Sequence, residues 1–160
     1  MEKTVLILRA VSGAGKTHFT SHAVQIAGGG VSVSADNFFM IEGNYVFIPS
    51  LLSEAHNACI RDFTHHVTGG SPLVIVDNTS TSNVEASPYH AVAAAHGYRV
   101  IHVVIDVDPA KAVNVHGVPP EGVARQHAAL MKALGESPPW WDVKRFPSAD
   151  AAVEWFKHLT

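Results

Sequence analysis

The stretch AVSGAGKT, residues 10–17, decides the fold, because it joins an apolar run to a helical pattern. Residues 4–8 are continuously apolar and β-rich, as expected of a strand covered on both faces. Residues 16–26 have a helical pattern, and the glycines at 28–30 end it. A glycine-rich turn from strand to helix lets backbone N–H groups approach an anion and aims the positive end of the helix dipole at it. The sequence therefore predicts a phosphate-binding loop here.

The loop matches the nucleotide-binding pattern G-x-x-x-x-G-K-[ST] except at its first position, where Ala10 replaces glycine. In this pattern Lys16 reaches the β- and γ-phosphates and the Thr17 hydroxyl binds Mg²⁺. We therefore predict ATP and Mg²⁺ as ligands. The alternative is a chance Gly-Lys-Thr at an ordinary strand–helix junction, and the flanking strand and helix favour the nucleotide. The predicted nucleotide-binding residues in the loop are Ser12, Gly13, Ala14, Gly15, Lys16 and Thr17.

Strand and helix patterns alternate along the rest of the chain. Apolar runs predict further strands, and a segment that contains two tryptophans ends in a possible short fifth strand: 31–34, 72–76, 98–105 and the end of 138–145. Helical patterns follow, the first with Ser50 as its predicted N-cap and the last capped by Ser148: 50–67, 84–96, 121–134 and 148–158. This alternation predicts an α/β fold, a P-loop NTPase-type three-layer sandwich with a mainly parallel sheet of four to five strands.

Composition predicts one globular domain over residues 1–160, because 47% of residues are hydrophobic and only 16% are charged. The net charge of −3 argues against a broad non-specific nucleic-acid surface but leaves room for a local basic groove. The single cysteine, Cys59, excludes an intrachain disulfide and suits a reducing cytosol. The apolar runs are too short to span a membrane, and the N-terminus lacks a signal-peptide layout. We therefore predict a cytoplasmic protein without a membrane partner.

Acidic residues follow two of the predicted strands. Asp36 comes after the second strand and Asp77 after the third. Ligands of parallel α/β sheets bind outside the carboxyl ends of the strands, so both carboxylates are expected to face the phosphate loop. Phosphoryl transfer to an alcohol needs a carboxylate that accepts the hydroxyl proton, and we assign this role to Asp36. Asp77 is expected to hold Mg²⁺ or to bind the acceptor. The alternative for each is a turn or a helix cap.

The order and spacing of these motifs resemble the small P-loop kinases of the polynucleotide-kinase type. The resemblance covers about residues 4–130. The stretches that carry it are GAGKT (13–17), SADNFF (34–39), DNTS (77–80) and HGVP (116–119). Members of that group use ATP and Mg²⁺ to phosphorylate hydroxyls on nucleic acid. They include 5′-hydroxyl kinases and phage kinases that phosphorylate 5-hydroxymethyluracil within DNA.

The resemblance implies a role for each matching residue. Lys16 and Thr17 become nucleotide ligands, and Asp36 becomes the general base as the first acid of the family's acidic pair. Asp77 and Thr79 are placed at the acceptor or metal site. Arg125, in the helix after the HGVP stretch, is placed in the lid and is expected to contact the nucleotide.

Three departures from the family pattern bear on the acceptor. Asn37 replaces the second acid of the pair, and Phe39 stands where 5′-hydroxyl kinases tend to have an arginine that contacts the acceptor phosphate. Val113 stands where a lid arginine is common. Without the first arginine, a phosphate at the acceptor end lacks its bidentate partner. Arg125, Lys111 or Mg²⁺ alone are the candidates to steady the transferred phosphoryl group.

An aromatic run at residues 38–47 also bears on the acceptor, because an aromatic wall suits a flipped or stacked base. We assign Phe39 to this wall and place 5-hydroxymethyluracil in DNA ahead of a 5′-hydroxyl end, in the host cytoplasm if the chain is phage-encoded. Ordinary packing of the aromatic residues is the alternative. A nucleoside or small-metabolite kinase, a non-catalytic ATP-binding switch and a degenerate P-loop domain remain open as other functions.

Overall fold

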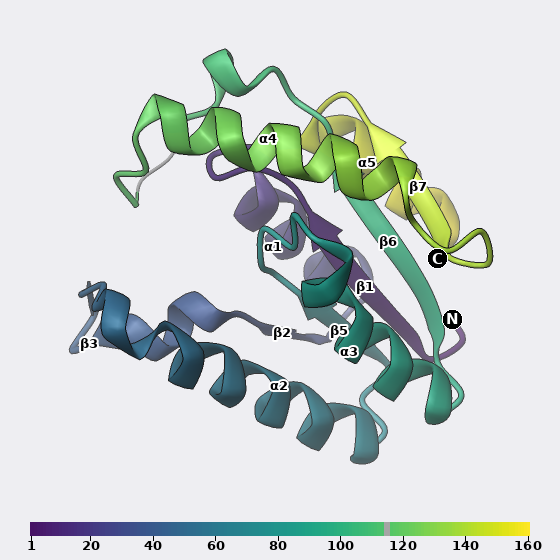
Figure 1. The fold of residues 1–160 in the computed structure, drawn as a ribbon. Helices are drawn as coiled ribbons and strands as arrows, with labels where there is room; N and C mark the ends of the chain where they lie inside the picture. Colours follow the sequence, from purple (N-terminus) through teal and green to yellow (C-terminus); the bar gives the residue numbers. More distant parts are fainter. Residues whose placement is uncertain (114–115) are drawn as a thin grey trace.

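The computed structural model contains a central sheet of five parallel strands in the order β2-β5-β1-β6-β7 (Figure 1). The structure describes residues 1–113 and 116–160. The strands of the sheet are β1 (Thr4–Arg9), β2 (Val31–Val33), β5 (Leu73–Val76), β6 (Arg99–Ile105) and β7 (Asp142–Phe146). The helices are α1 (Lys16–Ile26), α2 (Leu52–Thr68), α3 (Asn83–Ala95), α4 (Pro120–Gly135) and α5 (Ala149–Leu159). The predicted α/β fold with a mainly parallel sheet is confirmed, with five strands.

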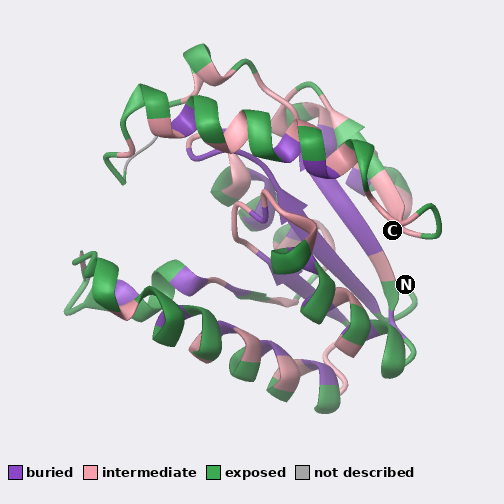
Figure 2. Ribbon diagram, viewed as in Figure 1, coloured by how far each residue is buried: buried purple, intermediate pink, exposed green. Residues whose placement is uncertain are grey.

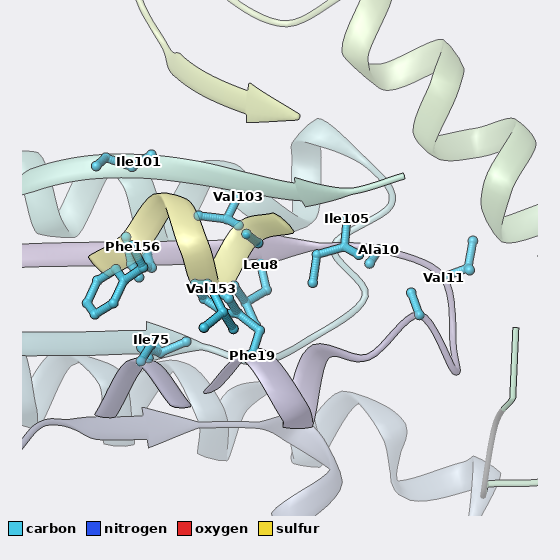
Figure 3. Packing of buried hydrophobic residues seen from close by; sticks show 14 of the residues in the cluster. Leu8, Ala10, Val11, Phe19, Ile75, Ile101, Val103, Ile105, Val153 and Phe156 are labelled. Carbon is cyan, nitrogen blue, oxygen red and sulfur yellow. The ribbon is translucent and has the colours of Figure 1, made fainter. Parts of the chain in front are cut away.

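Two hydrophobic clusters cover the two faces of the sheet. On one face, α1 and α5 pack against β1, β5 and β6, and the rings of Phe19 and Phe156 meet edge to face at 6.2 Å (Figure 3). On the other face, α2 and α3 supply Phe63 and Tyr89, whose ring centroids lie 5.0 Å apart. The central strands are buried on both faces, and the outward sides of the helices are exposed (Figure 2). Burial on both faces explains why β1 and β5 are continuously apolar.

Two local predictions between β2 and α2 need correction. Ser50 is not an N-cap, because Pro49 opens a 3₁₀ turn (Pro49–Leu51) and α2 begins only at Leu52, without a side-chain cap. The aromatic stretch at residues 38–47, where no strand was predicted, contains a short hairpin of β3 (Met40–Ile41) and β4 (Asn44–Tyr45). Its turn residues, Glu42 and Gly43, have φ values of 50° and 80°. Positive φ at both positions is the geometry of a tight two-residue hairpin, and glutamate at the first is an unusual signal for it.

The carboxyl-terminal half of the fold matches the predicted pattern closely. Ser82 caps α3 by accepting from the N–H of Glu85, and Ser148 caps α5 by accepting from the N–H of Ala151.

In the part of the chain that the structure describes, no helix has the length and apolar character needed to cross a membrane.

A histidine pair, with one ring buried and the other half-buried, lies between β6 and α3. His102 is fully buried, its Nε2 lies 2.9 Å from Nδ1 of His90, and the indole of Trp141 stacks on both rings. Burial, together with the nearby charge of Arg9, lowers the pKa of His102 from 6.5 to about 3. Burial also lowers the pKa of His90. The folded protein therefore keeps His102 neutral in mild acid.

We expect the fold to lose stability as the pH falls below about 6.5. Between about pH 6.5 and 3 the unfolded chain binds a proton at His102 that the folded chain does not bind, so acid favours unfolding. This residue alone lowers the free energy of unfolding by up to about 1.4 kcal/mol per pH unit. Urea unfolding from pH 8 to pH 4.5 measures the slope. His102→Phe, which keeps a ring against Trp141, should flatten it; an unchanged slope in this variant contradicts the assignment.

Candidate active site

A cavity of about 920 Å³ opens at the carboxyl ends of β1, β2 and β5. It is bordered by the phosphate loop, by the segments after β2 and β5, by the hairpin, and by the start of α4 with the residues before it. The residues that the argument below uses are Lys16, Thr17, Asp36, Tyr45, Phe47, Asp77, Thr79, His116 and Gln126. Parallel strands end at one edge of the sheet, so segments distant in sequence meet there.

The phosphate loop has the backbone that its glycines predict. Gly13 and Gly15 have φ values of 80° and 99°, in the left-handed region that favours glycine. Ala10, which replaces the first glycine of the pattern, is fully buried at the end of β1 and has no positive φ. Its N–H donates to the Thr79 carbonyl at 2.9 Å. The missing glycine therefore falls at a core position whose backbone does not need glycine.

Gly15 has no room for a side chain. A Cβ there would lie 2.8 Å from Cβ of Ala149 in α5. We expect Gly15→Ala to lower the free energy of unfolding by about 1–2 kcal/mol for the left-handed backbone and by about 1–3 kcal/mol more for the clash. Gly28→Ala is the matched control, because Gly28 has a φ of 69° and open space around it. Denaturant unfolding compares the stability of Gly15→Ala with that of Gly28→Ala. Adding Ala149→Gly to Gly15→Ala should restore the share of stability that the clash removes. Equal losses in both variants contradict the clash.

Lys16 begins α1 and points back over the loop. Its Nζ donates to the Val11 carbonyl at 3.1 Å, so the ammonium group is held over the loop. Burial lowers the pKa of Lys16, and the charges of Asp77 and Asp36 oppose that shift. A cation that is partly removed from water and faced by two carboxylates can bind phosphate oxygens strongly.

Asp77 lies directly after β5, where its N–H donates to the Val33 carbonyl at 2.8 Å. Its Oδ2 accepts from the Thr20 hydroxyl at 3.2 Å. Burial raises the pKa of Asp77, and the Lys16 charge opposes that shift. The Thr17 hydroxyl is exposed in the same cavity. One carboxylate and one hydroxyl suit Mg²⁺, which keeps several water ligands and is commonly held together with substrate phosphates. The residues present therefore fit the predicted metal.

Asp36 lies in the 3₁₀ turn η1 (Ala35–Phe39) after β2, where the Ser34 hydroxyl accepts from its N–H. Its half-exposed carboxylate has two neighbours. The Tyr45 hydroxyl donates to Oδ1 at 3.3 Å, and Nε2 of His116 lies 3.6 Å from Oδ2. Burial and the Asp36 charge raise the pKa of Tyr45 to about 12, so the phenol remains a donor. A carboxylate held in this way can orient an acceptor hydroxyl.

Two residues to which the sequence pattern gave no role fix the segments around the site. The Asn78 side chain accepts from the Ala35 N–H at 2.9 Å and so ties the Asp36 turn to the Asp77 segment. Arg9, fully buried at the end of β1, donates to the Ser80 carbonyl at 2.9 Å and to Oδ1 of Asn83 at 3.0 Å. The sequence signal for the role of Arg9 is the presence of an arginine at the end of an apolar strand.

Phe39 does not contact the cavity, and its predicted role as an acceptor-binding residue is wrong. It is the residue that closes η1, and its ring is turned into the core with only 2% of the residue exposed. The aromatic rings that line the cavity are Tyr45 and Phe47, which are nearly parallel at 6° with centroids 6.4 Å apart. The Phe39 ring lies nearly perpendicular to both and supports them from behind.

The predicted lid residue Arg125 is exposed on α4 and is not among the residues that line the cavity. Its neighbour Gln126 lines the cavity instead, and its Oε1 accepts from the Ser12 N–H at 2.9 Å. Val113, at the position where a lid arginine is common, donates its N–H to the Gly13 carbonyl at 3.2 Å. Asn114, next to it, lies outside the described residues. A nucleotide contact from Arg125 stays a prediction without geometric support.

The chain is similar to several known proteins. It is 31% identical over 131 residues to human NEDD4-binding protein 2, covering 76% of this chain but only 7% of the relative. A chain of the Pnkp1/Rnl/Hen1 RNA repair complex superposes with a TM-score of 0.69 at 15% identity, over 86% of this chain and 47% of that one. A putative kinase from Chloroflexus aurantiacus superposes with a TM-score of 0.66 at 11% identity, over 99% and 98%.

These two structural likenesses show that the chain shares its fold with those proteins. A family model for the AAA domain (AAA_33) matches residues 5–116, which include the phosphate loop, both acidic segments and His116. The match spans well over half of the sequence, so the chain belongs to this AAA domain family.

Proposed function

We propose that residues 1–160 act as one ATP-dependent kinase domain that transfers the γ-phosphate to a hydroxyl group on nucleic acid. The observation that carries the proposal is the position of Asp36. Its carboxylate lines the same cavity as Lys16 and Thr17, and it is oriented by Tyr45 and His116. An ATP-binding switch needs the phosphate loop but does not need a positioned carboxylate opposite it.

The loop and five side chains of the cavity have a defined part in the mechanism. The amides of the loop and the Lys16 ammonium bind the phosphates of ATP, and Thr17 and Asp77 are the residues that would hold Mg²⁺. The metal supplies positive charge beside the phosphates when it is bound. Asp36 accepts the proton of the acceptor hydroxyl while the hydroxyl oxygen bonds to the γ-phosphorus. The bond from that phosphorus to the β,γ-bridging oxygen breaks in the same step, and ADP leaves. The phenol of Tyr45 remains hydrogen-bonded to the carboxylate and keeps it in position.

Within this function we favour the 5-hydroxymethyl group of 5-hydroxymethyluracil in DNA as the acceptor. Among the described residues that line the cavity, Lys16 is the one lysine and no arginine is present. A phosphate next to the acceptor hydroxyl therefore has no bidentate partner, which favours a hydroxyl on a neutral group. The parallel rings of Tyr45 and Phe47 offer planar surfaces on which a base can stack. Likeness to a chain of an RNA repair complex supports a nucleic-acid substrate.

Labelled ATP with Mg²⁺ tests the proposal. The acceptors are DNA with internal 5-hydroxymethyluracil, an unmodified oligonucleotide with a 5′-hydroxyl end, and free nucleosides. We expect label at the internal modified base. Label at the 5′ end alone would replace the favoured acceptor with a polynucleotide end, and label on nucleosides alone would make the protein a small-molecule kinase. ATP binding without transfer to any acceptor contradicts a nucleic-acid kinase.

A further inference from the structure

A second cavity, of about 260 Å³, lies between α2 and the first turns of α3. We call it the side cavity; the residues that form it and that matter here are Ile60, Asn78, Thr79, Ser80, Val84, Glu85, Pro88 and Tyr89. We propose that the side cavity binds a nucleobase of the acceptor strand, next to the residue that is phosphorylated. This inference rests on the proposed function, because it takes the acceptor to be nucleic acid.

The side cavity adjoins the main cavity on the acceptor side. The two share His56, Asn78, Thr79 and Glu85 in their linings. The shared residues Asn78 and Thr79 follow Asp77 directly and belong to the segment after β5, whereas the phosphate loop borders only the main cavity. A strand whose reacting group is at Asp36 can therefore place a neighbouring residue in the side cavity without crossing the nucleotide site.

The walls of the side cavity have the chemistry of a base site. Ile60, Val84 and Pro88 supply apolar surface, and the buried Tyr89 supplies a ring. Polar groups stand at the rim, where Glu85 is exposed. No lysine or arginine is present among the described residues that line it. Apolar walls with polar edges fit a planar neutral ring that has hydrogen-bonding groups on its edge, and they do not fit a phosphate.

Val84 gives the clearest sign that a ligand covers this site. It lies in the first turn of α3 and is 83% exposed, more than any other large hydrophobic residue in the described part of the chain. A single exposed apolar side chain is ordinary on a protein surface. At the mouth of an apolar cavity, however, the same side chain can bury its methyl groups against a bound ring.

The backbone at Ser80, which lines the side cavity, is preorganised. Ser80 has a φ of 45° although it is not glycine, and it is buried. Such a backbone costs about 1–2 kcal/mol and persists only where its surroundings hold it. The buried Arg9 holds it here through the Ser80 carbonyl at 2.9 Å and Oδ1 of Asn83 at 3.0 Å. A preorganised floor lowers the entropy lost on binding.

The size of the side cavity limits what it can hold. Sites for drug-sized ligands have volumes of about 300–1,000 Å³. At about 260 Å³, the side cavity has room for one ring and not for a whole nucleotide. The sugar and phosphate of the bound residue must therefore lie outside it. Recognition of the ring alone predicts that an acceptor longer than one nucleotide binds better than a nucleoside.

The test compares a ligand that lacks one base with a protein variant in which an apolar side chain of the side cavity is replaced. The ligands are single-stranded trithymidylate and a trinucleotide of the same length with an abasic middle residue. The variants are Val84→Asp and, as the matched control, Ser87→Asp, which adds the same charge to an exposed position of α3 outside the lining. Binding is measured by NMR titration of the Val84 and Ile60 methyl signals in the wild-type protein and by equilibrium affinity in all three proteins.

We expect the wild type and Ser87→Asp to bind trithymidylate about tenfold more tightly than the abasic trinucleotide. This factor is about what the stacking of one base adds to affinity. In Val84→Asp the ratio of the affinities for the two ligands should fall to about one. In the wild-type protein the Val84 and Ile60 methyl signals should shift with trithymidylate and not with the abasic trinucleotide. Equal affinities in the wild type, or an unchanged ratio in Val84→Asp, overturn the inference. A base-dependent shift without phosphate transfer to any acceptor upholds the side cavity and contradicts the proposed kinase instead.

Discussion

Replacing Asp36 with asparagine is expected to lower the rate of phosphate transfer by about 10²–10⁴-fold, the usual contribution of a positioned general base. Asparagine keeps the shape of the side chain but cannot accept the proton of the acceptor hydroxyl. ATP affinity should change little, because we assign the contacts with the phosphates to the loop and Lys16 and not to Asp36. Single-turnover transfer from labelled ATP measures the rate, and calorimetry measures ATP binding.

Two variants control for this result. Asp62→Asn changes an exposed carboxylate on α2 outside the cavity and should leave transfer unchanged. Tyr45→Phe removes the hydroxyl that lies 3.3 Å from the Asp36 carboxylate but keeps the carboxylate itself. Loss of one hydrogen bond to a charged group, about 1.5–3 kcal/mol, corresponds to a loss of roughly tenfold to a hundredfold in rate. Full transfer by Asp36→Asn means that another group takes the proton.

Replacing Lys16 with methionine is expected to lower kcat/KM for ATP by about 10²–10³-fold, as loss of one group that stabilises the transition state does. The Lys16 ammonium is held over the loop by the Val11 carbonyl, where we expect the phosphates to bind. Methionine fills a similar volume without the charge. Burial lowers the pKa of Lys16 despite the two carboxylates, which means that the folded protein holds this charge at a cost. The free energy of unfolding should therefore not fall with the loss of activity.

Lys132→Met, on the exposed face of α4, is the matched control for Lys16→Met and should keep full activity. Initial rates at varied ATP concentration measure kcat/KM, and denaturant unfolding measures stability in both variants. Unchanged use of ATP by Lys16→Met refutes the assignment of the loop as the nucleotide site. A parallel loss of stability and activity assigns Lys16 a structural role instead.

The sequence by itself predicted the parts of the protein that depend on local patterns. The apolar run of β1, the glycine loop and the helix that follows fix one another through neighbours in the chain, so their geometry follows from residues 4–26. The positions of Asp36 and Asp77 at one edge of the sheet were also predictable, because the carboxyl ends of parallel strands share an edge. The fold class and the framework of the site needed no further information.

The missed features depend on contacts between segments far apart in the chain. The Asp36 carboxylate contacts Tyr45 from the hairpin and His116 from beyond β6, and no local pattern brings these together. Phe39 turned out to be buried although its neighbours are half-exposed, because the turn of η1 decides which ring faces the core.

The side cavity also depends on tertiary structure, because it exists only where α2 packs beside α3 over a strained Ser80 held by Arg9. The sequence by itself thus determined the fold and the nucleotide site, since neighbouring residues encode strands, helices and the glycine loop. Only the tertiary structure decided which side chains surround Asp36 and form the acceptor side, because packing between distant segments sets their directions.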